Sequence, residues 1–102
     1  MNKKVSAIIE ARMTSTRLPG KHMLPVFGKP IIKYLIDRLK KVQSLDNIVM
    51  ATTINKADDP LVKLSQESGI KYFRGSENDV MSRVIEAAES VSAEIIVSIT
   101  GD

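Results

Sequence analysis

Two apolar patterns alternate along this chain. Short runs rich in β-branched residues are typical of buried parallel strands, and they occupy residues 5–9, 47–53, 70–73 and 94–100. Between these runs, apolar residues recur at helical spacing and predict helices that begin near Pro30, Asp59 and Val80. Residues 23–27 are expected to form a plain apolar connection before the first of these helices.

Alternation of strand and helix predicts the α/β class, as a doubly wound, mainly parallel sheet with right-handed crossovers and helices on both faces. A length of 102 residues suits one domain, so residues 1–102 are interpreted as a single unit. Ligands of such sheets bind beyond the carboxyl ends of the strands. The side chains that follow predicted strand ends are therefore expected along one edge: Arg12, Thr52, Arg74 and Asp102.

Helix boundaries are marked by residues that favour capping. Two acids and a proline, Asp58 to Pro60, are typical of a helix start, and Gly69 is typical of a helix end. In the polar loop of residues 74–79, one of three side chains is expected to cap the following helix: Ser76, Asn78 or Asp79.

The first strand is followed by a cationic, hydroxyl-rich loop. Arg12, Arg17 and Lys21 lie within one connection without an intervening carboxylate. Ser15 adds a small hydroxyl, and Gly20 allows close approach of the backbone. These groups suit a polyphosphate, and we interpret the loop as the binding site for a nucleoside triphosphate.

Neither formal phosphate-loop pattern is present. Lys21 is followed by His22 rather than Ser or Thr, no glycine stands five residues before Gly20, and no G-x-G-x-x-G occurs in the sequence. The sequence thus supports neither a Walker-type ATPase nor a dinucleotide-binding Rossmann domain.

Composition excludes several classes of function. The chain has no Cys, so thiolate metal sites, disulfides and a Cys nucleophile are impossible. No apolar run approaches the roughly 20 residues needed to span a bilayer, and a cytoplasmic protein without membrane contact is expected. Residues 1–41 hold ten Lys or Arg against two acids, whereas residues 42–102 hold five against ten. The four aromatic residues are not interleaved with a basic stripe, so nucleic acid is not the expected partner.

Four motifs, in order, resemble a known family. They are residues 9–21 (I-E-A-R-M-T-S-T-R-L-P-G-K), 28–30 (G-K-P), 73–80 (F-R-G-S-E-N-D-V) and 99–102 (I-T-G-D). They resemble nucleotidyltransferases that activate acidic sugars with CTP, such as acylneuraminate and ketodeoxyoctonate cytidylyltransferases. The closest resemblance is to the SpsF group of spore coat polysaccharide biosynthesis. Family members run well beyond residue 102, so the chain resembles the N-terminal part of a fold like that of the nucleotide-diphospho-sugar transferases.

The resemblance implies transfer of CMP from CTP to an acidic sugar, with Mg²⁺ held by Asp102. It implies that Arg12 and Lys21 stabilise charge on the phosphates as catalytic residues. Further residues implied at the nucleotide are Ala11, Ser15, Arg17, Gly20, Arg74, Ser76, Asp79 and Arg83. Thr100 stands where ketodeoxyoctonate enzymes have a Gln that reads the cytosine.

Two alternatives stay open: a sugar nucleotidyltransferase that uses another triphosphate, and a non-catalytic nucleotide-binding or structural domain that retains the fold. We expect residues 1–102 alone to bind nucleotide weakly at most and to show no turnover. We also expect the surface that a longer chain would cover to promote self-association, for example as a homodimer.

Overall fold

Four parallel strands form the central sheet of the computed structural model, which describes residues 3–14 and 23–100. The order in the sheet is β5-β4-β1-β6. The bounds of these strands are β1 (Val5–Glu10), β4 (Asn47–Thr53), β5 (Lys71–Gly75) and β6 (Ile95–Thr100). The chain thus begins inside the sheet, moves to one edge and then crosses back to β6. This reversal is the mark of a doubly wound topology, and it places a switch point between β1 and β6.

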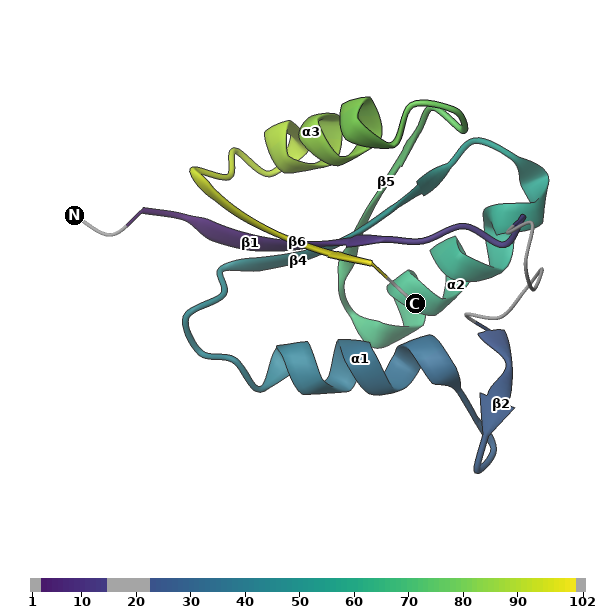
Figure 1. The fold of residues 1–102 in the computed structure, drawn as a ribbon. Coiled ribbons are helices and arrows are strands. Elements are labelled where there is room, and N and C mark those ends of the chain that lie inside the picture. Colours follow the sequence, from purple (N-terminus) through teal and green to yellow (C-terminus); the bar gives the residue numbers. More distant parts are fainter. Residues whose placement is uncertain (1–2, 15–22, 101–102) are drawn as a thin grey trace.

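Helices cover both faces of the sheet (Figure 1). On one face lie α1 (Ile31–Lys40) and α2 (Asp59–Ser68), and on the other lies α3 (Val80–Ser90). The predicted fold class, with a parallel sheet and helices on both faces, is confirmed.

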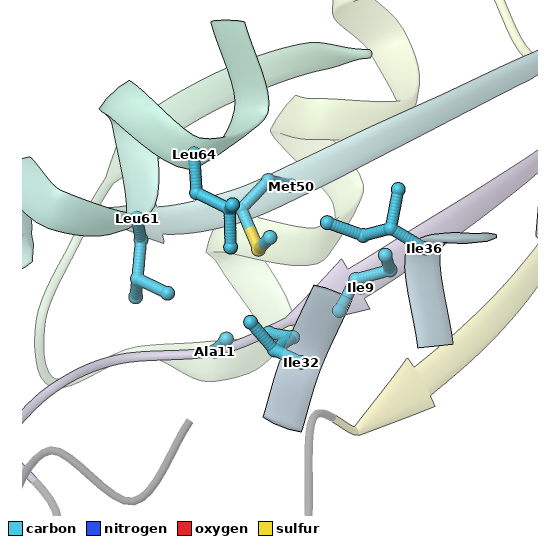
Figure 2. Packing of buried hydrophobic residues seen from close by; sticks show 7 residues of the cluster. All are labelled: Ile9, Ala11, Ile32, Ile36, Met50, Leu61 and Leu64. Carbon is cyan, nitrogen blue, oxygen red and sulfur yellow. The ribbon is translucent and has the colours of Figure 1, made fainter. Parts of the chain in front are cut away.

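The larger of the two described apolar clusters lies between the sheet and the helices α1 and α2. Ile9 of β1 and Met50 of β4 meet Ile32 and Ile36 of α1 there, and Figure 2 shows these side chains converging. Ala11, Leu61 and Leu64 complete the buried set. The other cluster joins alternate residues of the same strands to α3: Ile8, Val49, Ala51, Val84, Ala87 and Ala88. Successive side chains of a strand point to opposite faces, and both faces of β1 and β4 are buried, which explains the uninterrupted apolar runs of residues 7–9 and 48–51.

The helix boundaries follow local capping. Asn55 caps a short 3-10 turn, η2 (Lys56–Asp58), which leads directly into α2. Gly69 ends α2 in the left-handed conformation with φ 73°. Of the three candidates for the start of α3, Asp79 is the residue that caps it.

Residues 25–30 differ from the plain connection expected of the region after the first loop. Pro25–Val26 (β2) and Lys29–Pro30 (β3) pair as a small antiparallel hairpin. Phe27 and Gly28, at its turn, both have positive φ (52° and 77°), as a type I′ turn requires. The departure was not predictable from the apolar pattern, because two-residue strands are too short to show alternation.

Strand β6 lies at one edge of the sheet, and five of its six residues are exposed. Among the described residues, no helix is long and apolar enough to cross a bilayer.

Candidate functional site

The polypeptide just after β1 lies at the carboxyl edge of the sheet. Ala11 is buried, and its N–H donates to the carbonyl of Ala51 at the end of β4 (3.2 Å). Arg12 is half-buried. In register, Glu10 is opposite Thr100 of β6, so Arg12 follows β1 at the switch point between β1 and β6. This is the position at which doubly wound sheets bind ligands.

Asp58 is a completely buried carboxylate at this edge. Its Oδ1 accepts the backbone N–H of Met13 (2.6 Å), and its Oδ2 accepts the hydroxyl of Thr53. From the sequence, Asp58 is expected only at a helix start, and its contact with the loop after β1 is not predicted. One sequence feature could have indicated a further role for Asp58: two acids precede Pro60, whereas one acid suffices for a helix start.

Arg83 is also completely buried, although it lies on α3. One guanidinium nitrogen donates to Glu10 Oε1 (2.6 Å) and another to the carbonyl of Ser76 (2.8 Å). Its Nε has no hydrogen-bond partner within the described part of the chain. The side chain therefore joins α3 to the end of β1.

Arg74 bridges the end of β4 and the two segments that follow it. Its Nε and one terminal nitrogen donate to the carbonyls of Thr53 (2.7 Å) and Asn55 (2.8 Å). The other terminal nitrogen donates to the carboxylate of Asp59 at the start of α2 (2.8 Å). Arg74 thus connects the end of β4 with η2 and α2.

Ser76 and Asp79 interact with each other and with the start of α3. The N–H of Asp79 donates to Ser76 Oγ (3.2 Å), and Asp79 Oδ1 accepts the N–H of Ser82 (3.0 Å). Arg74, Ser76, Asp79 and Arg83 thus lie at the predicted edge and have structural partners there. Their contacts with a nucleotide remain predictions.

The other predicted site residues lie outside the described residues: Ser15, Arg17, Gly20, Lys21 and Asp102.

The donor groups at the edge can be tested for a fit to Mg²⁺. No group of three metal-ligating side chains occurs within residues 3–14 and 23–100. The acids described at this edge already have partners: Glu10 binds Arg83, Asp58 binds Met13 and Thr53, Asp59 binds Arg74, Glu77 binds Asn55, and Asp79 binds Ser82. Mg²⁺ needs few protein carboxylates when phosphates supply oxygens. A Mg²⁺ site at the carboxylate that follows β6 stays a prediction, because this carboxylate lies outside the described residues. Asp102 follows β6 in the sequence.

Comparison with known proteins decides the family. A family model described as cytidylyltransferase matches residues 6–102. The chain belongs to the cytidylyltransferase family. The uncharacterized protein MJ1063 of Methanocaldococcus jannaschii is 44% identical over 97% of this chain and 41% of its own. The spore coat polysaccharide biosynthesis protein SpsF of Bacillus subtilis is 37% identical over 93% of this chain and 41% of its own.

Solved structures of the cytidylyltransferase family have the same fold. A cytidylyltransferase from Leptospira borgpetersenii superposes with a TM-score of 0.93 at 40% identity, covering 99% of this chain and 42% of its own. A CMP:2-keto-3-deoxy-manno-octonic acid synthetase complexed with CTP superposes with a TM-score of 0.79 at 30% identity, over 97% and 40% of the two chains. The chain spans about 40% of the length of these relatives.

Proposed function

We propose that this chain is the nucleotide-binding part of an enzyme that transfers CMP from CTP to an acidic sugar, for a cell-surface or spore-coat polysaccharide. The observation that carries the proposal is the placement of Arg12 at the switch point of a cytidylyltransferase fold. Relatives named 3-deoxy-manno-octulosonate cytidylyltransferase support an acidic sugar as acceptor; one, from Geobacter sulfurreducens, is 31% identical over 96% of this chain. A cytoplasmic location belongs to the same proposal.

In the proposed reaction, the anomeric hydroxyl of the sugar attacks the α-phosphate of CTP, and pyrophosphate leaves. Such transfers depend on positioning and on neutralisation of phosphate charge more than on covalent help. Arg12 and Lys21 supply this positive charge, and Ser15, Arg17 and Gly20 line the phosphate loop. Bound Mg²⁺, held by Asp102, would neutralise further charge on the phosphate oxygens.

Two other functions make different predictions. A sugar nucleotidyltransferase of other specificity prefers UTP, GTP or ATP. A non-catalytic domain that retains the fold has no Mg²⁺-dependent affinity for a triphosphate.

The first test is titration calorimetry of the protein with CTP, UTP, GTP and ATP, with and without Mg²⁺. We expect selective binding of CTP, and the double variant Arg12→Ala, Lys21→Ala should weaken it about a hundredfold. A hydrogen bond to a charged group is worth about 1.5 kcal/mol or more, and two are removed.

The matched control is Arg38→Ala, Lys41→Ala, which removes the same charge from exposed positions at the end of α1. Equal loss of affinity in both double variants contradicts a specific phosphate role for Arg12 and Lys21. Preference for another triphosphate contradicts the choice of CTP.

A further inference from the structure

Arg12 lies between two residues that buried charged groups of other elements hold in place. Before it, the Glu10 side chain is bound by Arg83 of α3 (2.6 Å). After it, the Met13 N–H is bound by Asp58 from the end of η2 (2.6 Å). Within residues 10–13, the Ala11 N–H is bound by the carbonyl of Ala51 as well.

The two buried groups are themselves anchored. Asp58 also accepts the Thr53 hydroxyl from the end of β4, and Arg83 also donates to the Ser76 carbonyl in the loop between β5 and α3. Both side chains are completely buried. A buried charge is costly unless it is paired and bonded, so these contacts are hard to exchange for water.

We infer that Asp58 and Arg83 are positioning residues: Asp58 holds the Met13 backbone and Arg83 holds the Glu10 side chain, and together they set the Arg12 guanidinium for a triphosphate. This inference rests on the proposed function, because it concerns the same site. The inference requires no contact between either side chain and the nucleotide. Arg83 acts through Glu10, since its two terminal guanidinium nitrogens donate to Glu10 and to the Ser76 carbonyl.

The test is a double-mutant cycle between Asp58 and Arg12, with CTP affinity as the readout. We expect Asp58→Ala to weaken CTP binding about tenfold, because small displacements of a binding group are costly. If Asp58 acts through Arg12, the same substitution has little further effect in the Arg12→Ala background. An equal loss in both backgrounds overturns the inference.

The matched control is Asp46→Ala. Asp46 Oδ2 accepts the N–H of Val5 (2.7 Å), so this variant removes a carboxylate-to-backbone bond at the opposite end of β1. It should leave CTP affinity unchanged. Thr53→Val is a milder second variant if Asp58→Ala fails to fold: it removes one donor to Asp58 and should weaken binding less, again only when Arg12 is present.

Hydrogen exchange of the Met13 amide separates this inference from the proposed function. We expect Asp58→Ala to accelerate that exchange about tenfold or more, whereas Asp46→Ala should not. If no triphosphate binds to the wild type, the proposed function of this chain fails. The exchange rates alone then decide whether Asp58 holds the Met13 backbone. Unchanged exchange in Asp58→Ala overturns the inference whatever the affinity.

Discussion

Among individual residues, two completely buried ionisable side chains stand out. Asp58 and Arg83 are 0% exposed, yet each is held by partners from other segments. Replacing a buried ion pair by apolar residues can be neutral, whereas removing one partner leaves an unpaired charge. Loss of either group would therefore disturb Glu10 or Met13, the residues on either side of Arg12 that they bind.

Asp37 offers a pH test at the same scale. Hydrogen bonds from Lys29 and then from Lys33 lower the pKa of Asp37 to about 2. In the unfolded chain the pKa of an Asp is about 3.9. The ion pairs thus stabilise the fold fully above that pH, and their contribution is lost as the pH falls toward 2.

We expect Asp37→Asn to lower the urea midpoint clearly at pH 7 and much less near pH 2, where the carboxylate is partly protonated, as measured by circular dichroism. Exposed Glu89→Gln is the control and should show no such pattern. A constant difference between wild type and Asp37→Asn at both pH values contradicts the role of the two lysines.

At the scale of elements, the ends of helices and strands are set by local chemistry. Asp79 caps α3 and Gly69 ends α2, each at a residue whose type favours that position. The hairpin of β2 and β3 shows the opposite case. Its turn places exposed Phe27 at positive φ, which the residue type disfavours.

Gly69→Ala tests the end of α2. The added methyl meets only Lys40 Nζ at 3.8 Å, so its cost is backbone strain at φ 73° and not a clash. We expect a loss of about 1 kcal/mol, which lowers the Tm by about 4–8 °C in a domain of this size. Exposed Gln66→Ala, in the same last turn, is the control. An unchanged Tm in Gly69→Ala contradicts the argument from strain.

At the scale of the whole molecule, the β6 edge of the described sheet is poorly covered. In β6, Ile95, Ile96 and Val97 are 43–45% exposed, and the strand lies at the end of the sheet order. Unpaired backbone groups and apolar side chains on an edge strand favour association with another chain.

We expect the protein to self-associate at high concentration and Ile96→Lys to reduce this, because a lysine on an edge strand opposes pairing. Analytical ultracentrifugation over a concentration series is the measurement. Val80→Lys, at a similarly exposed apolar position on α3, should have no such effect. A strictly monomeric wild type contradicts the expectation.

Much of the fold was predictable because it depends on short-range patterns. The four parallel strands, the three helices and the role of Gly69 follow from apolar spacing and capping. Capping left Ser76, Asn78 and Asp79 as candidates for the start of α3, and the structure selects Asp79. The edge at which Arg12 and Arg74 lie follows from topology. The hairpin at residues 25–30 did not follow, since its strands are too short to form a pattern.

Residue types and their order are enough to predict the α/β class, the cationic loop and the family motifs. The contacts of Asp58 with Met13, 45 positions away, and of Arg83 with Glu10, 73 positions away, appear only when the chain is folded. Such pairings arise because parallel pairing places the carboxyl ends of β1, β4 and β5 at one edge of the sheet, and the segments that lead into α2 and α3 leave from that same edge. No local pattern encodes them, because each partner has an ordinary local explanation as a helix-start acid or a helix-surface cation.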